Sequence, residues 1–429
     1  MKIVSLTKET TKSIMDDLLK RSPNNYTEYE SVVNEIIENV KQNKDKAVFD
    51  YTLKFDRFTL TPDNIVVSKE EIAEAYAQMD AELVEVMKRA AENIRAFHAK
   101  QVRNSWFDAK EDGTILGMKI TPIQRAGVYV PGGKAAYPSS VLMNVIPAKV
   151  AGVPEIVMTT PPGADGKVNP GTLVAADIAG VDTIYKVGGA QAIAAMAYGT
   201  ESIPKVDKIT GPGNIFVALA KKAVYGYVSI DSIAGPSEIL VLADESANPR
   251  YIAADLLSQA EHDELASAIL ITTSMEVAKK VSEEVDKFTA ELSRKPIIEK
   301  SLENYGYILV ADSIEQAIET ANEIASEHLE ILTKNPFDTM TKIKNAGAIF
   351  LGEYSSEPLG DYFAGPNHIL PTNGTAKFFS PVNVDDFIKK TSIISYSKEA
   401  LEKVHVDIET FAKSEGLTAH ANSIAVRFE

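Results

Sequence analysis

The stretch GVYVPGGKAAYPSSVLMNVIPAKVAGVPEIVMTT, residues 127–160, decides the fold class. It begins with a short apolar run that ends in a Pro-Gly-Gly turn. An apolar segment of helical length follows, and then a second short apolar run. This order predicts a strand, a helix and a parallel strand, which together form the βαβ unit of α/β proteins.

The same alternation continues on both sides of a break near residue 230. Short apolar runs alternate with helical segments from 127 to 224, and again from 239 to 351, where one helix is expected over 314–328. The two sets predict an α/β protein with two Rossmann-like parallel-sheet units and helical N- and C-terminal extensions. The segment 355–380 is rich in Gly, Pro and Asn and too long for a simple connector, so we expect a functional loop there.

The composition narrows the class of protein. The chain has 429 residues, 45% hydrophobic and 24% charged, which is typical of a globular protein of two or more domains. A net charge of -16 argues against nucleic-acid or anionic-membrane partners. With no apolar signal core near the start and no long uncharged apolar run, a cytoplasmic enzyme is expected. Because cysteine is absent, disulfides, thiolate metal sites and thiol nucleophiles are excluded.

Four side chains are candidate metal ligands. Gln259 and His262 are three residues apart near the end of a predicted helix, where they share a face. Imidazole is a good zinc ligand and an amide oxygen is a rarer one, but such a pair is more often simply solvated. Asp361 lies in a Gly-rich loop and is either a ligand or a turn-forming residue. His420 is isolated near the C-terminus, where such a residue is more often incidental.

Two further features bear on catalysis and cofactor binding. Glu327 and His328 are adjacent, and a carboxyl beside an imidazole supplies two bases near neutral pH, unless the pair is an exposed helix end. Glycine-rich turns follow predicted strands at 131–133, 188–189 and 211–213. Such turns let backbone amides approach a phosphate, but no G-x-G-x-x-G fingerprint is present.

Two stretches closely resemble the signature of histidinol dehydrogenases: IDSIAGPSE at residues 230–238 and DLLSQAEHD at residues 255–263. The resemblance spans nearly the whole chain. Its other motifs, in order, are Tyr129–Gly133, Gly188–Ala192, Thr210–Asn214, Ser326–Glu330, Asn367–Thr372 and Glu415–His420. Each motif alone could arise by chance, but together and in this order they are highly specific.

The resemblance implies a zinc-dependent four-electron oxidation of L-histidinol to L-histidine through histidinaldehyde, with reduction of two NAD, in the final steps of histidine biosynthesis. The implied zinc ligands are Gln259, His262, Asp361 and His420, and the implied catalytic pair is Glu327 and His328. The implied substrate contacts are Ser237, Gln259, His262, His328, Asp361, Glu415 and His420. The implied cofactor contacts are Tyr129, Gln191 and Asn214, while His368 is a second-rank candidate.

The resemblance also implies an intertwined homodimer in which Glu415 and His420 reach the partner's active site. We expect four parts of the chain: 1–25 as an N-terminal helical extension, 26–128 with 238–381 as a discontinuous α/β domain carrying the zinc and catalytic residues, 129–237 as a Rossmann-like NAD-binding domain, and 382–429 as the segment that completes the partner's site.

Three other functions fit some of these features. A zinc hydrolase on an α/β scaffold would use a Glu base and the metal, but it would leave the glycine-rich turns unexplained. A non-catalytic binding protein of two α/β lobes would not need Glu327 or His328. A related NAD-dependent dehydrogenase acting on another amino alcohol or on a sulfonate is the narrowest alternative.

Overall fold

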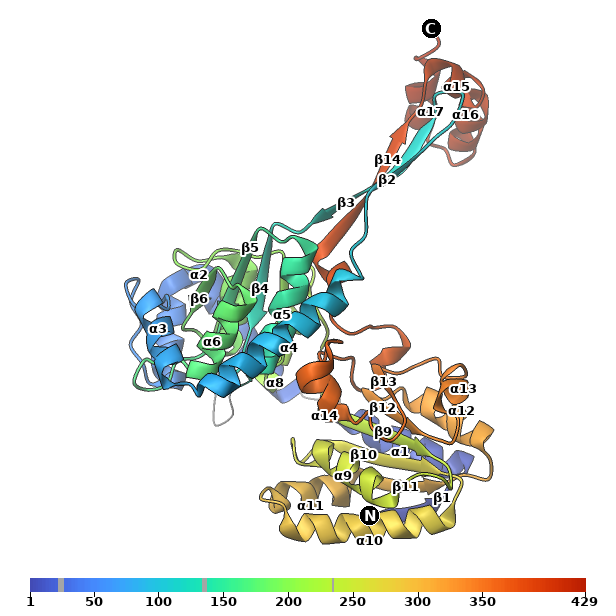
Figure 1. Cartoon of the computed structure of the whole chain (residues 1–429). Helices are drawn as coiled ribbons and strands as arrows, with labels where there is room; N and C mark the ends of the chain where they lie inside the picture. Colours follow the sequence, from blue (N-terminus) through green and yellow to red (C-terminus); the bar gives the residue numbers. More distant parts are fainter. Residues whose placement is uncertain (22–26, 133–136, 234) are drawn as a thin grey trace. The chain divides into compact units, whose positions relative to one another are not determined.

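The computed structural model describes residues 1–21, 27–132, 137–233 and 235–429 (Figure 1). The expected boundary at residue 25, together with Gly133 and Ala234 of the sequence motifs, lies outside the described residues. Two compact units are present: residues 1–101 with 123–387, and residues 102–122 with 388–429. Among the described residues, no helix is both long and apolar enough to cross a bilayer.

The first unit contains a six-stranded sheet in which every strand is parallel to its neighbours. Its order is β1 (Lys2–Ser5), β11 (Gly306–Val310), β10 (Ser267–Thr272), β9 (Glu238–Ala243), β12 (His328–Leu332) and β13 (Ala348–Leu351). We call this sheet and its helices the six-stranded lobe. Its helices are α1 (Lys8–Lys20), α9 (Pro249–Ala260), α10 (Met275–Glu291), α11 (Lys295–Tyr305), α12 (Ile314–Ile324) and α13 (Pro336–Met340).

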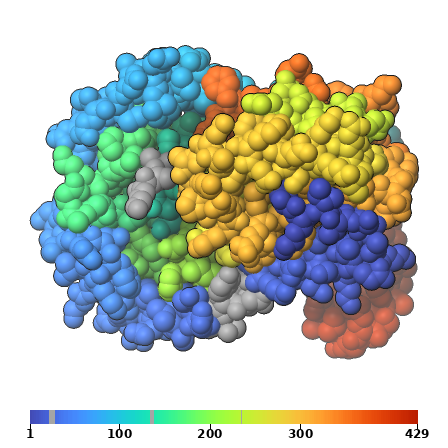
Figure 2. Space-filling view, turned by 90° about the horizontal axis from the view of Figure 1, so that it is seen from below, coloured from blue at the N-terminus to red at the C-terminus, as the bar shows by residue number. Residues whose placement is uncertain are grey.

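Alternation along the central strand explains why helices cover both faces of this sheet. Ile239 and Val241 belong to a core shared with α9 and α10, whereas Leu240 and Leu242 belong to a second core shared with α1 and α12. Successive side chains of a strand point to opposite faces, so an uninterrupted apolar strand needs both covers. Figure 2 shows the dark blue N-terminal residues against the yellow and orange surface of this lobe.

Two expectations for this lobe were wrong. The N-terminal residues were expected to be only helical, but Lys2–Ser5 pair with β11 at the edge of the sheet. The helix expected over 314–328 ends at Ile324, because Ala325 adopts a left-handed φ of 53° and turns the chain into β12. His328 is therefore the first residue of a buried strand and not a helix end.

A second parallel sheet lies in the same unit, and we call it with its helices the five-stranded lobe. Its order is β6 (Thr183–Tyr185), β5 (Glu155–Thr159), β4 (Arg125–Tyr129), β7 (Lys208–Thr210) and β8 (Ser229–Ile230). Its helices are α2 (Thr27–Asp56), α3 (Lys69–Gln78), α4 (Ala81–Ala99), α5 (Pro138–Ala151), α6 (Pro170–Ala179), α7 (Gly189–Tyr198) and α8 (Ile215–Val224).

The helices before residue 101 belong to this five-stranded lobe. Helix α2 packs on α7 and α8, α3 on α6, and α4 on α5. The apolar face of α4, which includes Met87 and Ile94, is buried in the core beneath β4 and β5. The sequence-based division grouped 26–128 with 238–381 instead; a helical pattern shows which face is apolar but not which sheet that face will cover.

The second unit contains an antiparallel sheet of order β14 (Ile388–Ser395), β3 (Ile115–Pro122) and β2 (Trp106–Ala109). Three helices follow: α15 (Lys398–Glu402), α16 (His405–Ser414) and α17 (Thr418–Ala425). The helical C-terminal tail expected after Ser397 is confirmed. This unit exposes many large apolar side chains, namely Val102, Trp106, Phe107, Ile394, Tyr396, Val406, Ile408, Phe411, Leu417 and Val426.

Candidate active site

Glu327 and His328 lie at the amino end of β12, both buried. The backbone there is held by the neighbouring strand, since the amide of Ala348 donates to the carbonyl oxygen of Glu327 at 2.9 Å. Gly347 makes this approach possible: a Cβ atom at that position would lie 2.4 Å from the same oxygen. The sequence thus fixes the place of the pair through a residue without a side chain.

Glu238, the first residue of β9, contacts both members of the pair. Its backbone amide donates to Oε2 of Glu327 at 2.9 Å, and its carbonyl oxygen lies 3.0 Å from Nδ1 of His328. A carbonyl only accepts, so Nδ1 carries a proton and Nε2 is the nitrogen that gains or loses one. The Glu238 carboxylate pairs with the buried Arg21 at 2.5 Å, and Arg21 also donates to the carbonyl oxygen of Leu265 at 2.8 Å.

Burial and charge move the proton affinities of these groups. Burial raises the pKa of Glu327 to about 8. For His328 burial alone would lower the pKa, but the carboxylates of Glu327 and Asp361 outweigh it and raise the pKa to about 10. Burial also disfavours the charged form of Asp361, yet His328 and His368 hold its pKa at about 2. A cation bound beside Asp361 would weaken this pairing and return His328 toward neutrality, where it can act as a base.

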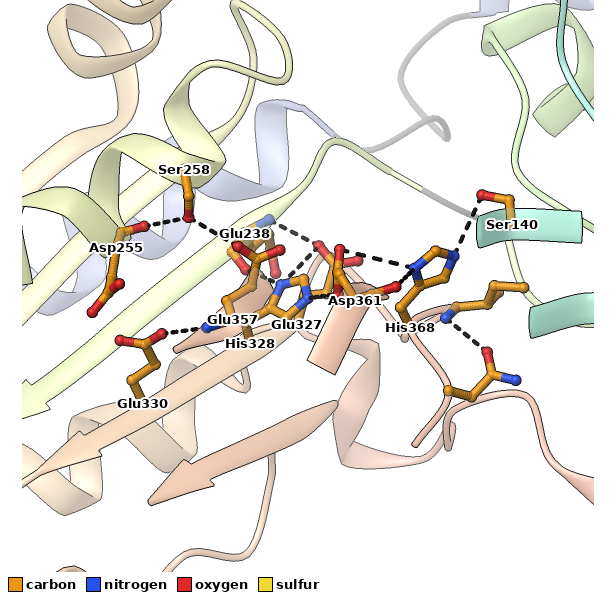
Figure 3. A network of polar contacts seen from close by, with 12 residues as sticks. Ser140, Glu238, Asp255, Ser258, Glu327, His328, Glu330, Glu357, Asp361 and His368 are labelled. Atoms are coloured by element: carbon orange, nitrogen blue, oxygen red, sulfur yellow. Dashed lines mark hydrogen bonds and ion pairs between the residues drawn. The ribbon is translucent and has the colours of Figure 1, made fainter. Parts of the chain in front are cut away.

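Asp361 comes from the Gly- and Pro-rich segment after β13, in η2 (Gly360–Ala364), which follows α14 (Glu357–Leu359). Figure 3 shows Asp361 between two imidazoles. Its Oδ1 lies 3.4 Å from Nε2 of His328, and its backbone oxygen lies 3.0 Å from Nδ1 of His368. Nε2 of His368 lies 3.3 Å from the hydroxyl of Ser140 on α5. The expected functional loop therefore brings a carboxylate to the Glu327–His328 pair.

Several groups here could hold a metal ion. Ligand atoms of His328, Glu357 and Asp361 lie within 4.8 Å of one another. Gln259 is fully buried at the end of α9, and neither its amide oxygen nor its amide nitrogen has a partner among the described residues. His262 is exposed but interacts electrostatically with Asp361. An unsatisfied buried amide, imidazoles and a carboxylate are together a donor set that suits zinc, so the residue types present fit that ion.

The local geometry of Gln259 and His262 differs from the expectation. Helix α9 ends at Ala260, so the two residues do not share a helix face. A turn joins them instead, because the amide of His262 donates to the carbonyl oxygen of Gln259 at 3.0 Å.

The remaining site candidates lie in two places. Ser237 is half-buried directly before β9, and its carbonyl oxygen accepts from the amide of Ser267 at 3.0 Å. Glu415 caps the end of α16 and His420 lies in α17; both are exposed and belong to the second unit. The first unit therefore brings together His262, Asp361, Glu327 and His328 without these two residues, and Gln259 lies three residues before His262.

The structure adds buried acids that sequence reasoning missed. Glu357 accepts a hydrogen bond from Ser258 at 2.9 Å, and its amide donates to Glu330 at 2.8 Å. Burial raises the pKa of Glu357 to about 8 and raises that of Glu330 well above its usual range. The one available signal was a charged residue inside an apolar strand pattern, as at Glu238 and Glu330, because such residues are rarely buried without a specific partner.

A separate cavity of about 800 Å³ lies at the carboxyl edge of the five-stranded sheet. Tyr129 ends β4, Gln191 lies in the first turn of α7, and Asn214 caps α8 directly after β7; all three line the cavity. The Tyr129 hydroxyl accepts from the amide of Gly189 at 3.2 Å, and Oε1 of Gln191 is buried without a partner among the described residues. β4 and β7 mark the point where the strand order reverses, which is where open α/β sheets bind ligands.

Known proteins of one family resemble this chain over nearly its whole length. A family model described as histidinol dehydrogenase matches residues 19–428. Histidinol dehydrogenase of Bacillus subtilis is 60% identical over 410 residues, 95% of this chain and 96% of that protein. The enzyme of Caldanaerobacter subterraneus is 56% identical over 428 residues, 100% of this chain and 99% of that protein.

A solved structure agrees with these relatives. The crystal structure of histidinol dehydrogenase from Elizabethkingia anophelis matches with a TM-score of 0.94 and 40% identity, covering 100% of this chain and 98% of that one. A family model over nearly the whole chain and relatives above 50% identity agree on one assignment. The chain belongs to the histidinol dehydrogenase family.

Proposed function

We propose that this chain oxidises L-histidinol to L-histidine in two NAD-dependent steps at the site around Glu327 and His328. As a member of its family the chain is a zinc- and NAD-dependent oxidoreductase of histidine biosynthesis. The observation that carries the residue assignment is the buried Glu327–His328 pair, which lies beside Asp361.

His328 takes the hydroxyl proton in the first oxidation. Its Nδ1 is fixed by the carbonyl of Glu238, so its Nε2 faces the substrate side and accepts the proton as hydride leaves the carbinol carbon for NAD. Gln259, His262 and Asp361, with His420 from the second unit of a partner subunit, would hold zinc. When bound, zinc supplies a fixed positive charge that orients the substrate's nitrogen atoms.

Glu327 serves the second oxidation, which needs water. The aldehyde product must become a hydrate before a second hydride can leave, and this chain contains no cysteine to form a thiohemiacetal. The buried Glu327, with a pKa near neutrality, removes a proton from the attacking water. Ser237 and Glu415 complete the substrate contacts, and Glu415 pairs with the cationic substrate.

The cavity of the five-stranded lobe holds NAD. Tyr129, Gln191 and Asn214 contact the cofactor, and the start of α7, where Gly188 provides no side-chain cap, favours its phosphates. Both lobes are Rossmann-like, since the two sheets share one strand order apart from β1 at the edge of the six-stranded sheet: the first three strands lie side by side, and the last two lie on the other side of the first. Residues 129–237 form the centre of the cofactor domain, with α2, α3 and α4 packed on it.

The enzyme works as an intertwined homodimer. The exposed apolar side chains of the second unit support this, because such a density of exposed apolar groups marks an interface. The segment 382–429 brings Glu415 and His420 to the partner's site. The cytoplasmic location expected from the sequence stays a prediction.

A substrate assay tests this function. Purified enzyme with zinc should form two NADH for each histidine when histidinol is added. A yield of one NADH with aldehyde as product would contradict the two-step assignment. No NADH with histidinol, but turnover of another amino alcohol, would favour the narrower alternative substrate.

A further inference from the structure

Asp56 is the one acidic side chain among the described residues that line the cavity of the five-stranded lobe. It is the last residue of α2. No described residue donates a hydrogen bond to its carboxylate, and Oδ2 is buried. An ionised carboxylate without donors is costly away from water, and burial raises the pKa of Asp56 to about 6. A ligand that brings hydroxyl donors would relieve this cost.

The topology of the five-stranded sheet indicates what Asp56 could bind. In doubly wound dinucleotide-binding sheets, an acidic residue at the end of the second strand accepts hydrogen bonds from the ribose hydroxyls. Here the second strand is β5, and the residues after it that line the cavity, Thr160 to Gly163, carry no charge. Asp56 lines the same cavity and supplies, from a helix before the sheet, the carboxylate that β5 lacks.

The end of α2 is held against the loop that follows β5. Arg57 adopts a left-handed φ of 61°, which ends the helix and turns the chain. Phe58 then packs on Gly166 so closely that a Cβ there would lie 2.3 Å from the ring. Backbone strain next to a close ring contact fixes the position of Asp56 before any ligand arrives.

The positive charges in the cavity do not suit an extra phosphate. Lys167 is the cationic side chain among the described lining residues, and its Nζ lies 3.3 Å from the carboxylate of Glu74. No arginine is among the described lining residues, whereas sites for a 2′-phosphate generally carry one.

We propose that Asp56 accepts hydrogen bonds from the adenosine ribose hydroxyls of NAD and selects NAD over NADP by repelling the 2′-phosphate. This proposal rests on the proposed cofactor cavity. Asp56 acts in recognition of the cofactor and not in the chemistry of the substrate.

Binding of NADH and NADPH to the full-length enzyme without histidinol tests the proposal, with dissociation constants measured by nucleotide fluorescence. Wild type should bind NADH the more tightly. Asp56→Ala should weaken NADH binding roughly tenfold or more, as for the loss of hydrogen bonds to a charged group, while NADPH binding stays equal or improves. Asp63→Asn is the matched control, because Asp63 is exposed, lies on the same connecting segment and does not line the cavity.

Each other outcome has a clear reading. Equal weakening of both nucleotides by Asp56→Ala, with an unchanged melting temperature, would overturn the proposal, as would equal affinity of wild type for both. Asp56→Asn keeps the size of the side chain and removes the charge. Relative to wild type, this variant should therefore improve NADPH binding more than NADH binding. If Gln191→Ala leaves NADH affinity untouched, the cavity itself is misassigned, a failure separate from that of Asp56.

Discussion

The sheets of the two lobes share one strand order apart from β1, but their candidate sites lie at opposite edges. In the five-stranded lobe, Tyr129 and Asn214 follow strands, so the cavity lies at the carboxyl edge. In the six-stranded lobe, Glu238 and His328 begin strands, so the candidate catalytic cluster lies at the amino edge. The usual rule for ligand sites in open α/β sheets describes the first lobe and fails for the second. Strand order alone therefore does not locate a site.

The two lobes also differ in the charged side chains that they bury. The five-stranded lobe buries lysines that each have a carboxylate partner, as Lys186 does with Glu71 and Lys208 with Asp386. The six-stranded lobe buries the carboxyls of Glu238, which pairs with Arg21, of Glu327, which lies beside His328, and of Glu330, which has no lysine or arginine partner among the described residues. A buried lysine that is paired with a carboxylate belongs to the scaffold. Buried acids with a raised pKa keep a proton near neutral pH, so we expect proton transfer in the six-stranded lobe.

Metal removal should have the largest effect, and it should affect the sites of the two lobes differently. We expect chelation to abolish turnover and zinc to restore it, because zinc would orient the substrate. The proposed ligands Gln259 and Asp361 are not among the described residues that line the cavity of the five-stranded lobe. NADH binding, measured on the same metal-free protein, should change little. Full activity without metal would remove zinc from the site, and loss of NADH binding would show that the two sites are not independent.

Glu327→Gln should slow the second oxidation much more than the first. Without the carboxylate, activation of water is lost, so the second oxidation should fall roughly a hundredfold to ten-thousandfold while the first is largely spared. Single-turnover NADH formation from histidinol and from the aldehyde measures the two steps. Glu323→Gln, at an exposed position on α12, is the control. Equal losses in both steps would contradict the assignment of water activation to Glu327.

Mixed dimers should show whether the second unit completes a partner's site. His420→Ala and Glu327→Gln are each expected to form almost no histidine, but a hybrid has one site with both residues intact. After random exchange of equal amounts, activity should return to about a quarter of wild type, since half of the dimers are hybrids with one working site each. No recovery after verified exchange would mean that each site takes His420 and Glu327 from the same subunit.

Gln191→Ala should weaken NAD binding, by a smaller factor than the losses of turnover expected above. Its buried amide oxygen has no partner among the described residues and is free to accept a hydrogen bond from the cofactor. One neutral hydrogen bond is worth roughly threefold to tenfold in affinity. The KM for NAD should rise while kcat stays near wild type; a fall in kcat with an unchanged KM would give Gln191 a different role.

The sequence predicted much of the fold and missed particular turns for physical reasons. The apolar runs of β4, β5, β9 and β10 predicted parallel strands, and these are confirmed. The helix expected over 314–328 ran four residues too far, into the first residue of β12, because Ala325 ends α12 in a left-handed conformation that glycine or asparagine usually adopts. The roles of the site residues came from the family resemblance, since no spacing rule joins Gln259 to Asp361. Glu238 acts through its backbone, which a side-chain pattern does not reveal.

The smallest expected effect concerns the buried acids of the six-stranded lobe. The folded state raises the pKa of Glu330 well above its usual value, chiefly by burial. In the window from about 4.5 upward the folded protein keeps a proton that the unfolded chain has lost, so Glu330 makes stability fall as pH rises. Glu330→Gln cannot titrate, but its oxygen can still accept from the amide of Glu357. Melting temperatures from pH 5 to pH 8 should therefore fall less for the variant, with a gain of a few degrees over wild type at pH 8. The same change at the exposed Glu319 should leave the pH profile unaltered, and parallel profiles for wild type and Glu330→Gln would mean that Glu330 is charged in its buried position.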